Sequence, residues 1–257
     1  MIHNSFIFLP KISHKTEQNI WQQGITEWDT FLNSKTVKGL SPLRKGFYDR
    51  QLMQAKKELF NNNTNYFTAL WPSTETWRMY NSFKDETCYL DIETCGTAIT
   101  IIGLYDGYDT KIMVRGINLD FKFLGQFLQR FKLIVSFNGS SFDLPMIEKY
   151  CPGTIPKVPH IDLRHCCARL GLNGGLKNIE KILGIQRIDD VVTMQGMDAV
   201  YLWQMWKSTG DREYLDKLIR YNEEDIINLK PIMEKVYRDL KEKILTQPKV
   251  ELVQVLF

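Results

Sequence analysis

The stretch TCYLDIET, residues 87–94, is rich in β-forming residues and predicts a strand. Side chains two apart on a strand leave the same face, so Asp91 and Glu93 lie side by side. Buried unpaired carboxylates are costly, and two neighbours raise each other's pKa unless a cation lies between them. A divalent metal ion at this strand meets both conditions. The structural alternative is an acidic face that meets solvent at the end of a sheet.

Strand-like and helix-like segments alternate around this stretch. Strands are predicted at 87–94, 98–106, 110–116, 132–138 and 160–165, the first three as an antiparallel meander. Helices are predicted at 119–131, after Ser140 or Ser141, at 175–185, at 197–208, and from Asp211 to beyond Leu240, where Pro231 should kink or divide the helix. This order predicts an α/β fold, a mixed five-stranded sheet of three antiparallel strands and then parallel strands, flanked by helices.

Further acidic residues occupy positions where functional groups collect. Asp143 follows the apolar strand KLIVSFN, at the carboxyl end where α/β sheets bind ligands. Its structural alternative is an acid that complements a helix dipole. In YNEEDIINL, residues 221–229, Tyr221 and Asp225 are four apart and share one helix face, while Glu223 and Glu224 point elsewhere. A polar, solvated helix face is the alternative there.

Three of these segments together resemble a known family. YLDIET, FNGSSFDLP and YNEEDIINL resemble the three exonuclease motifs of the DEDD superfamily, in the subgroup with tyrosine in the third motif. With HIDLRHCCARLG and GLKNIEKILGI, they resemble the YprB-like branch of ribonuclease-H-like exonucleases. The resemblance covers about residues 86–240. It implies a ribonuclease-H-like fold for this part of the chain.

The resemblance also implies roles for individual residues. The implied ligands of two Mg²⁺ or Mn²⁺ ions are Asp91, Glu93, Asp143 and Asp225. Tyr221 would orient the water that attacks the phosphorus, because a phenol with a pKa near 10 is a poor base at neutral pH.

Three further residues are expected to contact substrate, and each has a structural alternative. The resemblance places Thr94 near the terminal nucleotide and Asn138 within reach of substrate or the metal-bound phosphate, and Lys177, at a predicted helix start, could meet a phosphate. Their alternatives are a plain strand residue, a turn residue that tolerates left-handed geometry, and a solvated lysine. Asp162 and Arg187 match the narrower branch without an assigned role.

The implied function is a metal-dependent 3′→5′ exonuclease that releases nucleoside 5′-monophosphates from the 3′ end of single-stranded nucleic acid. Two alternatives stay open: a nucleic-acid-binding module that kept the fold without catalysis, and an endonuclease of the same fold. Residues 85–245 are expected to form the exonuclease domain and residues 246–257 a C-terminal tail.

Residues 1–84 have a different character, basic and mainly helical. They hold eleven Lys and Arg against six Asp and Glu, whereas the remainder holds twenty-two against twenty-four. IWQQGITEWDTFL (20–32) resembles half of a helix-hairpin-helix, which favours DNA over RNA, or it is an ordinary packing unit. YFTALWPSTETW (66–77) would either stack bases or pack this region onto the catalytic body.

Composition excludes several classes of protein. Five cysteines without a CxxC pair argue against a disulfide framework, and His160, His165, Cys166 and Cys167 lack a second ligand pair for zinc. Neither a signal peptide nor a membrane span is evident in the sequence. We therefore expect a cytoplasmic protein with no membrane partner.

Overall fold

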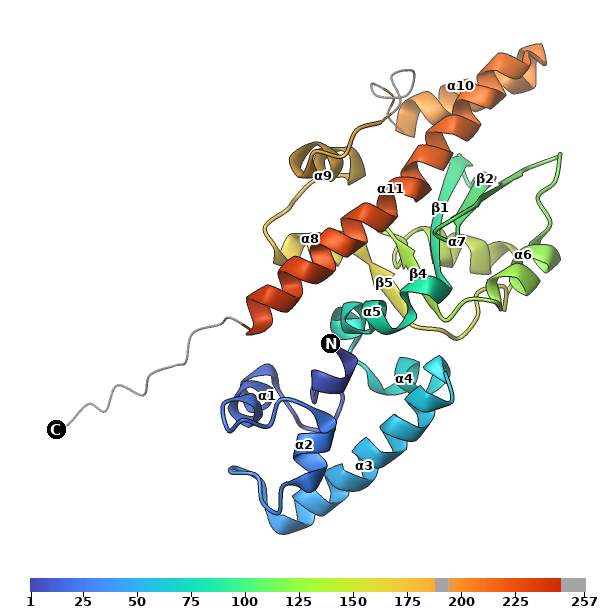
Figure 1. The fold of residues 1–257 in the computed structure, drawn as a ribbon. Coiled ribbons are helices and arrows are strands. Elements are labelled where there is room, and N and C mark those ends of the chain that lie inside the picture. Colours follow the sequence, from blue (N-terminus) through green and yellow to red (C-terminus); the bar gives the residue numbers. More distant parts are fainter. Residues whose placement is uncertain (188–193, 195, 246–257) are drawn as a thin grey trace.

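The computed structural model describes residues 1–187, 194 and 196–245, and a five-stranded sheet lies at its centre (Figure 1). The strand order is β3-β2-β1-β4-β5, with β1 Thr87–Cys95, β2 Ala98–Tyr105, β3 Thr110–Val114, β4 Leu133–Ser136 and β5 His160–Asp162. The pairs β1–β2 and β2–β3 are antiparallel, whereas β1–β4 and β4–β5 are parallel. The predicted mixed sheet is confirmed.

Helices cover both faces of the sheet. On one face, α6 (Phe121–Leu128) and α7 (Asp143–Tyr150) bury Cys88, Leu90 and Ile92 of β1. On the other face, α11 (Arg212–Leu245) runs diagonally, with α10 (Gly196–Thr209) beside its first half (Figure 1). Successive residues of β1 alternate between these faces. Asp91 and Glu93 are therefore placed on the α11 side, as the alternation predicts.

The last predicted strand is shorter than expected. β5 ends at Asp162, and α8 (Leu163–Arg169) begins at the next residue, where a longer strand was predicted. The Asp162 carboxylate accepts a hydrogen bond from the N–H of Arg164 at 3.1 Å and so caps the helix. After α8, the chain forms α9 (Leu176–Leu183), which packs with α8 against α11.

Pro231 does not divide the last helix. α11 continues through Pro231, which is itself exposed, while its neighbours Leu229, Ile232 and Met233 are buried. Proline removes one backbone hydrogen bond from a helix, but burial of an apolar face stabilises the helix on both sides of it. The prediction that Pro231 divides the helix is wrong because it considered the lost backbone hydrogen bond and not the burial of the apolar face.

The region before β1 is mainly helical, as predicted. It contains α1 (His14–Trp21), α2 (Trp28–Asn33), α3 (Pro42–Phe60), α4 (Thr64–Leu70), α5 (Tyr80–Phe83) and the 3₁₀ turns Ile2–Asn4, Ser73–Met79 and Lys84–Glu86. Between α1 and α2, the N–H groups of Gln23 and Gly24 donate to the carbonyls of Ile20 and Trp21. These donors are used inside the turn, which favours the packing unit over a phosphate-binding hairpin.

This N-terminal region shares its core with the sheet. Phe67, Trp71 and Trp77 are buried in a cluster that also contains residues of β1, β4, β5 and α11. The Trp77 ring meets the Tyr237 ring of α11 edge-on, with centroids 6.0 Å apart. The aromatic segment 66–77 therefore packs the two parts together.

A buried ionic cluster reinforces the same interface. Arg78 is completely buried and pairs with Glu17 and Glu75, and Arg169 of α8 pairs with Glu75 at 2.9 Å. The predicted tail, residues 246–257, lies outside the described residues. Among the helices that the structure describes, none is long and apolar enough to cross a membrane.

Candidate metal centre

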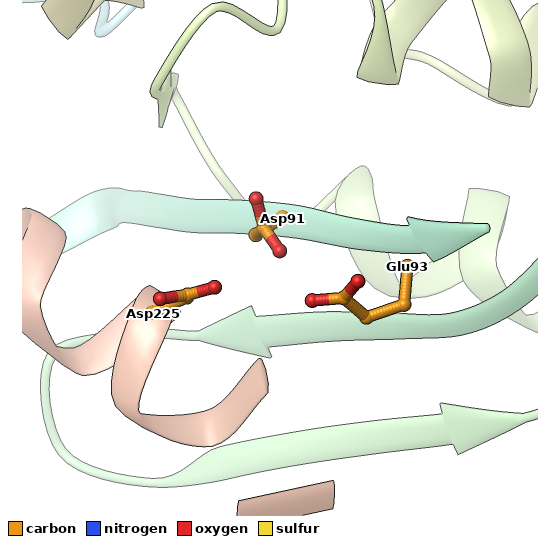
Figure 2. A group of neighbouring side chains, drawn as sticks. All are labelled: Asp91, Glu93 and Asp225. Atoms are coloured by element: carbon orange, nitrogen blue, oxygen red, sulfur yellow. The ribbon is translucent and has the colours of Figure 1, made fainter. Parts of the chain in front are cut away.

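Three carboxylates from two elements meet on the α11 side of the sheet. Figure 2 shows Asp91 and Glu93 on β1 and Asp225 on α11 pointing toward one another, with one oxygen of each within 4.8 Å of the others. The strand alternation places the first two, and the crossing of α11 over β1 brings the third from 132 residues further along the chain. We call these three residues the acid cluster.

Asp143 lies next to the acid cluster. Its Oδ1 accepts a hydrogen bond from the N–H of Ile92, the residue between Asp91 and Glu93, at 3.0 Å. The side chain is 3% exposed, at the first position of α7. The four acids named by the sequence motifs are thus neighbours, although Asp143 is not part of the tight group of three.

Burial and mutual repulsion make these carboxylates hard to ionise. Burial raises the pKa of Asp91, and the charges of Asp143, Asp225 and Glu93 raise it further. Burial likewise raises the pKa of Glu93, followed by the charges of Asp225 and Asp143. The pKa of Asp143 rises to about 7 and that of Asp225 to about 6, with burial the largest cause.

These properties fit a divalent metal ion. All the donors are carboxylate oxygens, which hard cations such as Mg²⁺ and Mn²⁺ prefer. A bound cation would offset the repulsion that raises the four pKa values. The chemistry of the donor set therefore agrees with a metal centre at the acid cluster.

Tyr221 lies one helical turn before Asp225 and is 6% exposed. The Lys177 Nζ lies 4.5 Å from the centre of its ring, and the guanidinium carbon of Arg187 lies 5.8 Å from it. Burial raises the pKa of the phenol, and the charges of Asp225, Glu93 and Asp91 add to this. Tyr221 is therefore neutral and can donate or accept a hydrogen bond beside the acid cluster. Glu223 points away from the acid cluster and accepts a hydrogen bond from Thr110 of β3.

A buried polar network holds Asp225 from behind. Arg187, whose side chain is 4% exposed, hydrogen-bonds Asp225 and forms two bonds of 2.6 Å with Glu180 of α9. Asn228 donates to Glu180 at 3.1 Å. From the sequence alone, Arg187 has no assigned role, and Glu180 and Asn228 are not predicted to belong to the site. The available signal was a glutamate at a buried position of the amphipathic helix α9.

A second contact missed by the sequence analysis holds Asp91. Asn222 Nδ2 donates to Asp91 Oδ2 at 2.9 Å, from a side chain that is fully buried against β2. A Cβ at Gly103 would lie 2.1 Å from Asn222 Oδ1, so only glycine admits this amide. In the sequence, the glycine inside the strand pattern IIGLY is the feature that indicates this contact.

The three residues expected to contact substrate lie around this centre. Thr94 follows Glu93 at an irregularity in the pairing of β1 with β2. Asn138 lies in the loop after β4 with φ of +67°, the left-handed geometry considered for it, and its Oδ1 accepts a hydrogen bond from Arg164 at 2.7 Å. Burial, followed by the charge of Arg187, lowers the pKa of Lys177, whose amine lies over the Tyr221 ring. Lys177 is therefore not a freely solvated lysine.

Asp162 has a structural role in positioning Asn138. Its carboxylate accepts from the N–H of Asn138 at 2.8 Å and from the N–H and hydroxyl of Ser140. Burial raises the pKa of Asp162, but these hydrogen bonds lower it below its ordinary value. His160, on the same strand, bonds to the Ser136 hydroxyl at 2.8 Å, and burial lowers its pKa to about 4.

Comparison with protein-family models agrees with the fold. The family model described as the RNase_H superfamily matches residues 88–237, more than half of the chain. A family B DNA polymerase from the hyperthermophilic archaeon Pyrobaculum calidifontis is similar in structure over 58% of this chain, with a TM-score of 0.48 and 14% identity. This chain spans 24% of that polymerase. No curated protein matches the sequence.

Proposed function

Because the chain belongs to the RNase_H superfamily, we propose that it is a metal-dependent 3′→5′ exonuclease of the tyrosine subgroup of the DEDD superfamily, in its YprB-like branch. It would remove nucleoside 5′-monophosphates from the 3′ end of single-stranded nucleic acid, with DNA favoured over RNA. The proposal assigns the exonuclease to residues 85–245 and gives residues 1–84 a supporting role. The observation that carries it is the acid cluster, with Tyr221 one helical turn from Asp225.

The proposed metal ligands are Asp91, Glu93, Asp143 and Asp225. When bound, two Mg²⁺ or Mn²⁺ ions would activate water and stabilise the attacking and leaving oxygens of an in-line phosphoryl displacement. Charge balance supports two ions rather than one. Glu180 and Arg187 cancel, so four ionised acids and Lys177 leave a formal charge of minus three. Two divalent ions and one phosphodiester group bring this total to zero.

Tyr221 is proposed to orient the attacking water rather than to deprotonate it. Its pKa is raised above an already high ordinary value, so it remains protonated at neutral pH. Its ring is in contact with the cationic side chains of Lys177 and Arg187. A phenol fixed in this way can hold a water with little loss of rotational freedom on reaction.

The remaining residues are proposed to hold the phosphate and the terminal nucleotide. Lys177 has a buried Nζ with no hydrogen-bond partner among the described residues, which suits a contact with the scissile phosphate. Thr94 and Asn138 are proposed to contact the terminal nucleotide from either side of the centre. Arg187 holds Asp225 toward the metal site through its bond to Glu180.

The experiment that tests this function is digestion of 5′-labelled single-stranded DNA and RNA of one sequence. Each reaction contains Mg²⁺, Mn²⁺ or EDTA, and Asp91→Asn is the matched control. We expect a metal-dependent ladder that shortens from the 3′ end, and a loss of about a thousandfold or more in the control. Cleavage of circular single-stranded DNA would identify an endonuclease instead. Binding of either polymer without cleavage in any metal would identify a non-catalytic module.

A further inference from the structure

A cavity of about 770 Å³ opens between α8 and the start of α9. We call it the α8–α9 cavity; it is lined by Phe137, Asn138, Arg164, Ala168 and the segment 172–176, which contains Gly174 and Gly175. Its volume lies in the range of pockets that hold small ligands. It lies at the carboxyl ends of the parallel strands β4 and β5, where open α/β sheets bind their ligands.

The walls of the α8–α9 cavity connect it to the candidate metal centre. On one side, Asn138 begins the loop that leads to Asp143 at the start of α7. On the other side, Leu176 precedes Lys177, whose amine lies over the Tyr221 ring. Short chain segments, from Asn138 to Asp143 and from Leu176 to Lys177, therefore join the lining of the cavity to residues of the candidate metal centre.

The lining combines apolar surface with donors for an anion. Phe137, Leu172 and Leu176 provide apolar walls, and none of the lining residues is acidic. The exposed Arg164 brings a guanidinium to the edge of the cavity and is fixed by its bond to Asn138 Oδ1. Asp162, the last residue of β5, is 8% exposed, and its carboxylate accepts hydrogen bonds from backbone N–H groups.

The start of α9 adds backbone donors to this lining. Gly175 is the N-cap, with no side chain to accept from the first turn of the helix. Gly174 has φ of +108°, and a Cβ there would lie 2.9 Å from Asn178, so a larger residue is excluded. Both glycines line the cavity with Leu176, the first residue of α9, and a helix N-terminus is a favourable position for phosphate.

We propose that the α8–α9 cavity holds the part of the single-stranded substrate immediately 5′ of the bond that is cleaved. Its phosphate lies between Arg164 and the start of α9, and its base packs on Phe137, Leu172 and Leu176. This inference rests on the proposed exonuclease function and adds a site for the leaving strand. It predicts that substitutions in the cavity change KM for an oligonucleotide and have little effect on a substrate that has only a terminal nucleotide.

Ala168 offers a direct test, because it is exposed, lines the cavity and lies one helical turn after Arg164. Ala168→Glu places a negative charge there that also pairs with Arg164. Ala168→Lys has a similar size and the opposite charge, and Ala168→Gln is neutral. All three substitutions are at a solvent-exposed helix position, and circular dichroism melts check that they fold.

The full-length variants are compared on two substrates with Mn²⁺. One is a 5′-labelled single-stranded ten-nucleotide DNA, and the other is the p-nitrophenyl ester of thymidine 5′-monophosphate, which has no strand beyond the leaving group. We expect Ala168→Glu to raise KM for the oligonucleotide by about fivefold or more and Ala168→Lys to lower it, with Ala168→Gln between them. Hydrolysis of the ester should stay within about twofold of wild type in all three variants.

The outcomes separate this inference from the proposed function. If wild type cleaves both substrates and the three variants share one KM for the oligonucleotide, the cavity does not hold the strand. If Ala168→Glu slows the ester as much as the oligonucleotide, the cavity holds the terminal nucleotide and the assignment is overturned. If wild type cleaves neither substrate, while the charge series still changes binding of the oligonucleotide, the exonuclease proposal fails and the binding site stands.

Discussion

Replacing Asp143 by asparagine should make the metal-free protein more stable at alkaline pH. The folded protein holds the pKa of this carboxyl at about 7, compared with an ordinary value of 3.8, chiefly because the group is buried. Asparagine has the same shape and no charge, and its oxygen can still accept the bond from the N–H of Ile92. The substitution therefore removes the cost of ionising the group inside the protein.

The pH dependence follows from the direction of the pKa shift. Below about pH 4 the carboxyl is neutral in both the folded and unfolded chain, and the substitution changes little. Between pH 4 and 7 the folded chain retains a proton that the unfolded chain has lost, so wild type loses stability relative to the variant. Above about pH 7 the carboxyl is ionised in both states, and wild type bears the full free-energy cost of ionising it inside the folded protein. The pKa differs by about three between the folded and unfolded chain, and each pKa unit corresponds to about 1.4 kcal/mol. The upper limit on the stabilisation by Asp143→Asn is therefore about 4 kcal/mol.

The assay is thermal unfolding in EDTA at pH 4, 6 and 8. About 2 kcal/mol, half of the upper limit, corresponds to a Tm increase of about 4–8 °C for Asp143→Asn at pH 8 in a chain of this size. Asp109→Asn, on the exposed β2–β3 turn, is the control and should leave Tm unchanged. Added Mg²⁺ should stabilise wild type more than Asp143→Asn and so reduce the difference in Tm between the two proteins. A variant no more stable than wild type at pH 8 would refute the reasoning.

Other predictions test the residues around the centre. Tyr221→Phe should lower kcat by about a hundredfold with little change in KM, because the ring packs as before and only the hydroxyl is lost; an equal change in both constants contradicts this. Glu180→Gln should lower the free energy of unfolding by about 2 kcal/mol, because the buried Arg187 keeps Asp225 but loses one of its two paired carboxylates, whereas Asp239→Asn in a more exposed pair should cost under about 1 kcal/mol; denaturant titration compares them. Deletion of residues 1–84 should abolish cooperative unfolding by circular dichroism, because their core is shared with the sheet; a sharp melt of the remainder contradicts this.

The sequence was sufficient where one local rule decides the geometry. Strand alternation alone places Asp91 and Glu93 on a common face, and helical spacing alone places Tyr221 near Asp225. The apolar run of β4 predicts a strand buried on both faces, and all its residues are buried. In each case the signal lies within a few residues, so tertiary contacts had little scope to change the outcome.

The sequence was insufficient where contacts between distant segments decide the geometry. Asn222 bonds to Asp91 across 131 positions, and Arg187 bonds to Asp225 across 38. Neither partner is marked by local spacing, and a single polar residue on a helix has many surface roles. The prediction of a longer β5 was wrong for a related reason. The Asp162 carboxylate caps α8 and also accepts a hydrogen bond from the N–H of Asn138 in the loop after β4. A strand pattern does not reveal that its last acid will cap a helix.

α11 links the candidate metal centre to the N-terminal region. Its first half carries Tyr221 and Asp225, and its second half carries Tyr237, whose hydroxyl accepts a bond from the amino group of Met1 and whose ring meets Trp77. Pro231 lies between these halves, within a helix whose core face is continuous from Leu229 to Val236. Because that face is buried against the sheet and the N-terminal region together, a displacement of the second half would disturb the packing that positions Asp225. The N-terminal region thus stabilises the helix that carries Tyr221 and Asp225, although it contributes none of the four acids.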